Sequence, residues 1–388
     1  MKKIVLAYSG GLDTSCAIRW FKDRGYDVVC FIADLGQGED FRKIEDRGLE
    51  AGASKVYIKD LEKEFIDDFI VAAIKANAVY EGKYVLATAL GRPLIAKYLV
   101  EVAHKEKADT IAHGCTSKGN DQVRLEVTAS ILDPKLTILA PLRDWEFKSR
   151  EEEIEYALKN KIPIDVTKKK IYSIDRNIWG VSIEAGILED LKQEPPEDAY
   201  LMTKSPLTAP KPRYVEIAFE KGVPVKLDGK KTALKDIIMA LNKTAGAYGI
   251  GRSDMVENRL VGIKSREIYE APGATVILAA HRELESLVLD RETSHFKETV
   301  SLKYSELIYY GLWYSELKKA LDGFINSTQK YVTGSIKMKL MPGQCVVAGR
   351  QSPYSLYKKE LATYGKEDKF DQKLAEGFIR LWGMPYKR

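Results

Sequence analysis

The first 163 residues alternate between short apolar runs and longer segments whose apolar residues recur at helical spacing. Short apolar runs bounded by turn residues predict buried strands, and apolar positions three and four residues apart predict helices. The predicted strands cover residues 3–8, 27–32, 55–58, 109–113 and 137–139, and the helices between them include 61–77 and 88–107. Because alternating strands and helices pair in parallel through right-handed crossovers, this half predicts an α/β fold with a doubly wound parallel sheet.

The second half of the chain has a less regular pattern and shows no repeats. It predicts a mixed α+β domain with strands at 214–219, 223–227, 259–263, 331–340 and 344–350, and helices at 234–242, 274–290, 292–309 and 314–327. We therefore expect three parts, at residues 1–165, 166–362 and 363–388.

The last part has the pattern of an amphipathic helical arm. Its apolar residues recur at helical spacing; they are Phe370, Leu374, Phe378, Leu381 and Trp382. Such a helix either folds back on its own domain or docks on another subunit, and the pattern leaves both open.

Composition narrows the class of protein. The chain has 388 residues, more than one ordinary core holds, and 45% of them are hydrophobic and 30% charged. The net charge of +5 is spread along the chain, so it hints at anionic ligands and gives no argument for a nucleic-acid partner. No apolar run approaches the roughly 18 residues of a membrane span, so we expect a cytoplasmic protein without a membrane partner.

Cysteine and histidine usage gives little sign of metal or redox chemistry. The four cysteines and four histidines are scattered, and no C-x-x-C pair occurs. This usage favours a reducing compartment with inert thiols. We expect no metal ligands from protein side chains.

The strongest chemical signal follows the first predicted strand, at residues 7–15 (AYSGGLDTS). A strand, a glycine turn and a helix place backbone N–H groups and a helix N-terminus before an anion. We expect positive φ at Gly10 and Gly11, hydroxyl donors at Ser9, Thr14 and Ser15, and an N-cap at Asp13 or Thr14. No lysine follows the glycines, so this is not the common NTPase loop. An ordinary glycine turn is the alternative.

Two further loops lie where a doubly wound sheet binds its ligand, past the carboxyl ends of its strands. One covers residues 33–38, and the other is the donor-rich stretch 114–124 (GCTSKGNDQVR). Asp121 and Arg124 are three residues apart, so they share a helix face. A surface ion pair is the alternative there.

These motifs together resemble a known family. The sequence at 7–15 resembles the pyrophosphate loop of the N-type ATP pyrophosphatases, whose fold is adenine-nucleotide alpha-hydrolase-like. Combined with the sequences at 33–37, 114–124, 172–180 (YSIDRNIWG) and 249–266 (GIGRSDMVENRLVGIKSR), it resembles argininosuccinate synthase. The similarity covers about residues 3 to 350, and its later motifs are close to diagnostic in combination.

The resemblance implies an enzyme of arginine biosynthesis and the urea cycle. This carbon–nitrogen ligase joins L-citrulline to L-aspartate through a citrullyl-adenylate, converting ATP with Mg²⁺ to AMP and pyrophosphate. The family is homotetrameric with C-terminal arms, which favours docking of the arm on another subunit.

The resemblance also implies a role for individual residues. The ATP-binding set is Ala7, Tyr8, Ser9, Gly10, Gly11, Leu12, Asp13, Thr14, Ser15, Ala33 and Gly114. The aspartate set is Thr116, Asn120 and Asp121. The citrulline set is Tyr84, Asn120, Arg124, Ser173, Ser182, Glu257 and Tyr269. We expect Asp13, Asp121 and Arg124 to be catalytic; whether Asp121 orients the aspartate amine or accepts its proton stays open.

One position departs from the family. Alanine stands at 89 where the family usually has serine, so one hydroxyl contact to citrulline is missing. The neighbouring Thr88 would face differently on a helix. Rival hypotheses are a tRNA-modifying ATP pyrophosphatase, a non-catalytic nucleotide sensor and a glutamine-dependent amidotransferase. Thiolation usually uses paired cysteines and the amidotransferase an early nucleophilic cysteine, both of which are missing here.

Overall fold

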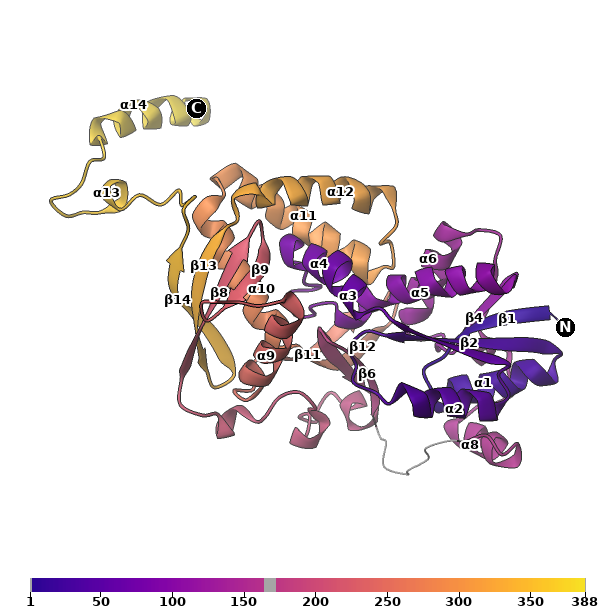
Figure 1. The fold of residues 1–388 in the computed structure, drawn as a ribbon. Coiled ribbons are helices and arrows are strands. Elements are labelled where there is room, and N and C mark those ends of the chain that lie inside the picture. Colours follow the sequence, from indigo (N-terminus) through magenta and orange to yellow (C-terminus); the bar gives the residue numbers. More distant parts are fainter. Residues whose placement is uncertain (1, 164–171, 388) are drawn as a thin grey trace.

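A computed structural model describes residues 2–163 and 172–387, and its first part is a five-stranded parallel sheet (Figure 1). The strands are β1 (Lys2–Ala7), β2 (Tyr26–Asp34), β3 (Lys55–Asp60), β4 (Thr110–His113) and β5 (Thr137–Leu139). They pair in the order β3-β2-β1-β4-β5, so the chain reverses direction across the sheet between β1 and β4. The predicted doubly wound sheet is confirmed.

Helices cover both faces of this sheet because its strands are apolar on both sides. Ile4 and Leu6 of β1 belong to one buried cluster, and Val5 between them belongs to another. The first cluster includes α1 (Leu12–Asp23), α2 (Phe41–Ala51) and α8 (Arg150–Lys159), and the second includes α5 (Ala87–Glu106) and α6 (Asp121–Leu132). The helix predicted at 61–77 consists of α3 (Glu62–Glu64), a π-helical stretch (Phe65–Ile70) and α4 (Val71–Ala76). The short α7 (Pro141–Asp144) lies between β5 and α8.

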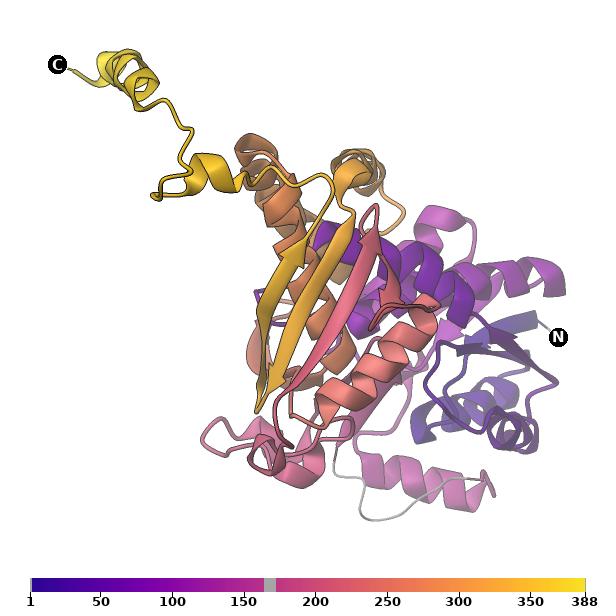
Figure 2. The ribbon, with the colours of Figure 1, turned by 60° about the vertical axis from the view of Figure 1, so that its left-hand side comes forward.

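The second part contains a five-stranded antiparallel sheet backed by helices (Figure 2). Its strands are β8 (Arg213–Glu220), β9 (Val223–Leu227), β10 (Lys230–Lys231), β13 (Gly334–Met341) and β14 (Gln344–Gln351). The helices are α9 (Leu234–Gly246), α10 (Pro272–Val288), α11 (Arg291–Tyr309) and α12 (Glu316–Thr328). Phe69 stacks on Trp313 with ring centroids 4.4 Å apart, so one core runs between the two parts.

A third, four-stranded sheet lies between these two parts. Its strands are β6 (Ser173–Asn177), β7 (Gly180–Glu184), β11 (Arg252–Asn258) and β12 (Lys264–Glu270), in the order β11-β12-β7-β6. The strand predicted at 259–263 is wrong, because these residues form the turn between β11 and β12. Arg259 N donates to Ile263 O, and Gly262 has φ of +86°.

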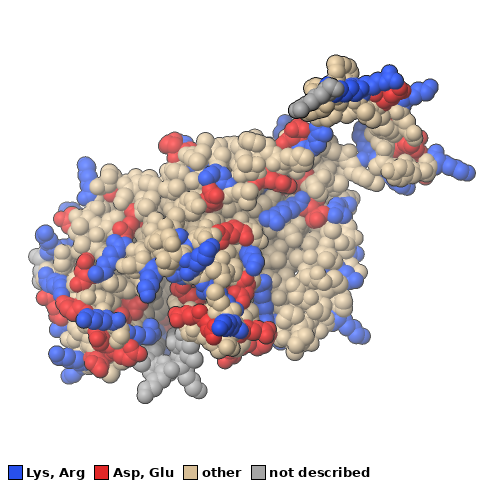
Figure 3. All heavy atoms as spheres, turned by 180° about the vertical axis from the view of Figure 1, so that it is seen from behind, with Lys and Arg blue, Asp and Glu red and all other residues tan. Residues whose placement is uncertain are grey.

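Short 3-10 turns connect the remaining elements of the second part, at Gly186–Glu189, Glu197–Ala199, Pro206–Thr208 and Gln329–Tyr331, and a further one at Met384–Tyr386 lies in the last part. The boundary predicted between 165 and 166 lies outside the described residues. No helix in 2–163 or 172–387 is both long and apolar enough to cross a membrane. On the face in Figure 3, Lys and Arg are interspersed with Asp and Glu.

The C-terminal arm leaves the body of the molecule (Figures 1 and 2). It contains α13 (Lys359–Ala362) and α14 (Gln372–Gly383), so the amphipathic helix is confirmed. Its predicted apolar residues are all more than half exposed, and Leu374 is 71% exposed. The arm therefore does not fold back on its own domain in this structure.

Candidate functional site

The site begins where the sheet reverses direction, at the carboxyl ends of β1 and β4. A Cβ atom added at Gly114, just after β4, would lie 2.6 Å from Thr14 Cγ2 in the loop after β1. A side chain there would push the two loops apart. Ala33 lies at the carboxyl end of β2, beside β1. The predicted ATP-binding residues therefore share one edge of the sheet, as ligands of such folds require.

The loop after β1 differs from the prediction at two points. Gly10 has φ of +74°, and a Cβ atom there would lie 2.7 Å from Ile44 Cγ2. Gly11 has φ of −75° and is itself the N-cap of α1, so its predicted positive φ is wrong. The prediction of Asp13 or Thr14 as N-cap is also wrong, because the helix begins at Leu12 and both residues lie in its first turn.

Hydroxyl groups hold this loop, which we call the phosphate loop (residues 7–15), in place. Ser9 Oγ lies 3.2 Å from Thr14 Oγ1 and accepts from Gly11 N at 3.4 Å, and Tyr8 Oη lies 3.2 Å from Ser15 Oγ. Within the described chain no side chain caps α1. The helix N-terminus therefore keeps its N–H groups for an anion.

Asp13 faces a second carboxyl group that no sequence motif marks. Burial raises the pKa of Glu153 on α8 to about 8, and the charge of Asp13 and a hydrogen bond with it add to this shift. Glu153 is therefore mainly protonated at neutral pH. Among residues 2–163 and 172–387, no three His, Cys, Asp or Glu side chains are grouped to hold a metal ion.

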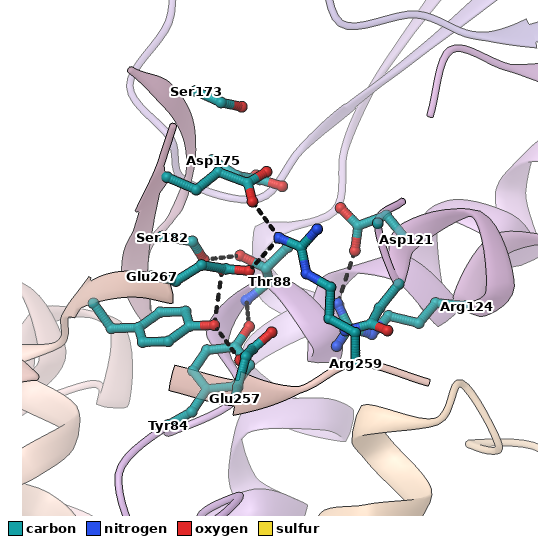
Figure 4. Close-up of a pocket in the computed structure, with 14 residues that line it drawn as sticks. Tyr84, Thr88, Asp121, Arg124, Ser173, Asp175, Ser182, Glu257, Arg259 and Glu267 are labelled. Carbon is teal, nitrogen blue, oxygen red and sulfur yellow. Dashed lines mark hydrogen bonds and ion pairs between the residues drawn. The ribbon is translucent and has the colours of Figure 1, made fainter. Parts of the chain in front are cut away.

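Beyond the phosphate loop lies a polar pocket of about 510 Å³, part of it open to solvent (Figure 4). All residues of the predicted citrulline set line it, as does Asp121. They come from the segment before α5, the start of α6, the β6–β7 hairpin and the β11–β12 hairpin. The structure thus brings together residues that are up to 185 positions apart in sequence.

Arg124 and Asp121 form the predicted pair on one face of α6. Arg124 Nη1 donates to Asp121 Oδ1 at 2.8 Å, and its Nε donates to Tyr309 O at 2.9 Å. Arg92, which also contacts Asp175, donates to Asp121 Oδ2 at 2.8 Å. Burial alone would raise the pKa of Asp121, but the two arginines outweigh it and lower that pKa. The pair is nearly buried, with 4% of Arg124 exposed, so a surface ion pair is excluded.

Glu257 is the buried carboxylate on the opposite wall. It accepts from Tyr269 Oη at 2.6 Å and from Tyr309 Oη at 2.8 Å. Burial raises the pKa of Glu257 to about 7, and the nearby charge of Glu267 contributes. Tyr269 stacks on Tyr84 at 4.0 Å between ring centroids. Glu257 is thus a carboxylate that gains from a positively charged ligand.

Some lining residues were missed by the sequence reasoning, and one predicted residue lies elsewhere. Thr88 lines the pocket, with Oγ1 2.6 Å from Ser182 Oγ, whereas Ala89 is buried and does not line it. Thr88 therefore supplies a hydroxyl where one was thought missing. Thr116 is exposed on the loop after β4, outside the pocket. Arg259, Glu267, Glu184 and Asp175 also line the pocket. Asp175 and Arg259 lie within the motifs at 172–180 and 249–266, but none of the four was given a role from the sequence.

A phosphate loop at the switch point of a parallel sheet, beside a charged pocket, defines a nucleotide-dependent enzyme of the HUP class. A family model described as the arginosuccinate synthase N-terminal HUP domain matches residues 3–163, and the C-terminal domain model of that family matches 172–388. The chain belongs to the argininosuccinate synthase family.

Curated relatives agree along the whole chain. Argininosuccinate synthase of Carboxydothermus hydrogenoformans is 55% identical over 388 residues, covering 100% of this chain and 97% of the relative. That of Dictyoglomus turgidum is 57% identical, covering 99% and 96%. A solved 4-thiouridine synthetase–RNA complex with bound ATP is 18% identical with a TM-score of 0.31, covering 41% of this chain and 40% of that one, and carries no further argument.

Proposed function

We propose that the protein joins L-citrulline to L-aspartate, forming argininosuccinate while ATP is converted to AMP and pyrophosphate. The observation that carries this proposal is the course of residues 114–124. Their first residue, Gly114, packs against Thr14 of the phosphate loop, and Asn120, Asp121 and Arg124 line the polar pocket. A nucleotide and an amino acid bound at these two places would meet, and positioning of reactants is the main demand of this chemistry.

The reaction needs ATP because the ureido group of citrulline is unreactive. Attack of the ureido oxygen on the α-phosphorus forms a citrullyl-adenylate and releases pyrophosphate. The aspartate amine then attacks the ureido carbon and displaces AMP. We propose that ATP enters as its Mg²⁺ complex and that its polyphosphate lies on the backbone N–H groups of residues 9–15, which stabilise the departing pyrophosphate. Ala33 and Gly114 would contact the nucleoside.

Citrulline would occupy the pocket in Figure 4. Glu257 would bind the citrulline ammonium, which relieves the cost of its buried charge. Arg124 would bind the carboxylate. Two of its nitrogens already donate within the protein, and Asp121 keeps Arg92 as a partner when Arg124 turns to the ligand. Tyr84, Ser173, Ser182 and Tyr269 complete the citrulline set.

Aspartate would lie on the residues that join the two places. Thr116 and Asn120 would hold it, and Asp121 would either orient its amine or accept its proton. Asn120 is fixed for this role, because its Nδ2 donates to Tyr309 Oη at 2.7 Å and its Oδ1 accepts from Leu260 N at 2.9 Å.

The test is release of pyrophosphate from ATP with citrulline and aspartate added singly and together. We expect AMP and argininosuccinate in equal amounts when both are present, and little net turnover when either is missing. ADP as the product, or turnover that does not depend on citrulline, would refute the proposed reaction.

We also propose that the protein is a cytoplasmic homotetramer, divided at 165/166 and 362/363, whose arm docks on another copy. The projecting α14 with its exposed apolar face supports this proposal. Removal of the residues after Lys369 should lower the number of chains in the assembly, measured by sedimentation. An unchanged sedimentation profile would contradict the proposed docking.

A further inference from the structure

We propose that Arg259 is the residue that sets the affinity for aspartate, by fastening residues 114–120 to the wall of the pocket. The inference rests on the proposed function and assigns a role to a residue outside the three predicted ligand sets. Arg259 lies in the turn between β11 and β12 and reaches across the pocket (Figure 4). We call it a positioning residue because it acts through the loop.

Arg259 connects three separate segments. Its Nη1 donates to the carbonyl oxygen of Lys118 at 3.0 Å, and its Nη2 donates to Glu267 on β12 at 2.8 Å and to Glu184 on β7. The next residue, Leu260, donates its backbone N–H to Asn120 Oδ1. The turn therefore holds the loop at Lys118 and at Asn120, on either side of Gly119 and close to Thr116.

The side chain of Arg259 retains a buried donor that faces no partner. The side chain is 9% exposed and lines the pocket, and its Nε finds no hydrogen-bond partner among the residues that the structure describes. Buried polar groups are normally satisfied, so an unsatisfied guanidinium nitrogen beside the pocket indicates a side chain whose contacts are completed when a polar ligand binds.

Charge points to aspartate as that ligand. At neutral pH aspartate has a net charge of −1 because it has two carboxylates, whereas citrulline is a neutral zwitterion. The proposed aspartate residues Thr116, Asn120 and Asp121 include no cation. Arg259 brings a buried positive charge to this loop and is paired with Glu184 and Glu267, which also line the pocket and would repel a carboxylate if that charge were lost.

The experiment separates the citrulline step from the aspartate step. Exchange of labelled pyrophosphate into ATP needs citrulline and no aspartate, whereas argininosuccinate formation needs both. For Arg259→Gln we expect KM for aspartate to rise by about tenfold or more, and the citrulline-dependent exchange rate to fall by a clearly smaller factor. Arg259→Lys keeps the charge but loses the guanidinium fork, so its aspartate KM should lie between those of the wild type and Arg259→Gln.

The matched control is Arg266→Gln. Arg266 lies in the same hairpin, is 8% exposed and is paired with Asp254, but it does not line the pocket. The Arg266→Gln variant should lower the thermal midpoint about as much as Arg259→Gln does. Its aspartate KM should stay within about twofold of wild type.

Two results would overturn the inference: an unchanged aspartate KM in Arg259→Gln, or a loss of exchange as large as the loss of aspartate affinity. If Arg259→Gln does not fold, Arg259→Lys must show the selective rise in aspartate KM, and its absence overturns the inference equally. Absence of exchange in the wild-type protein would instead refute the proposed function, and the inference with it.

Discussion

The phosphate loop and the amino-acid pocket lie side by side, but they are constructed in different ways. The loop is a continuous stretch of nine residues, 7–15, whose shape comes from one positive φ, small side chains and hydroxyl contacts within the stretch. The pocket is a network of buried charged and aromatic side chains from segments between Tyr84 and Tyr269, and each charge has partners from another element.

This difference teaches where function and stability are coupled. A charged residue of the phosphate loop has few partners in the fold, so its removal should affect the reaction far more than the stability. A charged residue of the pocket supports both, because its removal leaves an opposite charge buried without compensation. Four substitutions test this contrast, from the largest expected effect to the smallest.

Asp13→Ala should abolish ATP-dependent turnover, by about 10³-fold or more, because the loop loses its one charged side chain and ATP is proposed to enter as its Mg²⁺ complex. The free energy of unfolding should stay the same or rise, since the charge that helps to raise the pKa of Glu153 is removed. Pyrophosphate release and thermal unfolding measure the two effects.

The control for this variant is Asp23→Ala at the other end of the same helix. Asp23 is paired with Arg19 at 2.9 Å on the surface, so neither turnover nor stability should change much. Undiminished turnover in Asp13→Ala would remove the phosphate loop from the mechanism.

Arg124→Ala should show the combined loss that the pocket predicts. Breaking a buried ion pair costs about 3–5 kcal/mol of stability, and Arg124 also donates to Tyr309 O and lies over the Tyr309 ring. The KM for citrulline should rise much more than the KM for ATP. Denaturant unfolding and steady-state kinetics with each substrate varied give both numbers.

Arg143→Ala is the matched control. Arg143 is paired with Glu126, which lies on α6 as Arg124 does, but Arg143 is 37% exposed and outside the pocket. Its cost in stability should be about 0–1 kcal/mol. Equal rises in both KM values for Arg124→Ala would contradict its place in the citrulline site.

The same contrast decides what the sequence alone predicts. The parallel sheet, the phosphate loop and the Asp121–Arg124 pair were predicted because each depends on residues close together in the chain. Thr88 was expected to face away and Arg259 was given no role, because Ser182 and Lys118, which they contact, are 94 and 141 positions away. The turn at 259–263 was mistaken for a strand because Leu260, Val261 and Ile263 form an apolar run, although they are 37%, 39% and 44% exposed. The ligand roles rest on family resemblance and remain predictions.

Gly10→Ala should weaken the phosphate loop without disturbing the pocket. Its φ of +74° disfavours any side chain, and the new Cβ would lie 2.7 Å from Ile44 Cγ2. We expect a loss of about 2 kcal/mol in unfolding free energy and a rise of about tenfold in KM for ATP. The KM for citrulline, measured at saturating ATP, should not change.

Gly25→Ala is the control for this substitution. Gly25 has φ of +82°, at the other end of α1, but a Cβ atom there would meet nothing within 4 Å. It should therefore lose stability through backbone strain alone and keep the wild-type KM for ATP. A similar ATP KM in both variants would show that the shape of the loop at Gly10 does not matter for the nucleotide.

Glu257→Gln should give the smallest effect on stability, visible as a change in its pH dependence. In the folded protein burial raises the pKa of Glu257 from 4.5 to about 7. Below pH 4.5 the group is protonated in both states and costs nothing; as the pH rises toward 7, ionisation of the unfolded state is favoured and stability is lost. Glutamine is always neutral, so as the pH rises from about 5 to about 8 the unfolding free energy of the wild type should fall relative to that of the variant.

Glutamine keeps an oxygen that can accept from Tyr269 and Tyr309, so the slopes of the two curves, rather than their heights, carry the result. Glu267→Gln supplies the control, because it removes the neighbouring charge that contributes to the shift. In that background the pH-dependent effect of Glu257→Gln should shrink. Parallel stability curves for wild type and Glu257→Gln across this range would show that the buried carboxylate is already compensated without a cationic ligand, and the pocket would then resemble the phosphate loop in keeping function apart from stability.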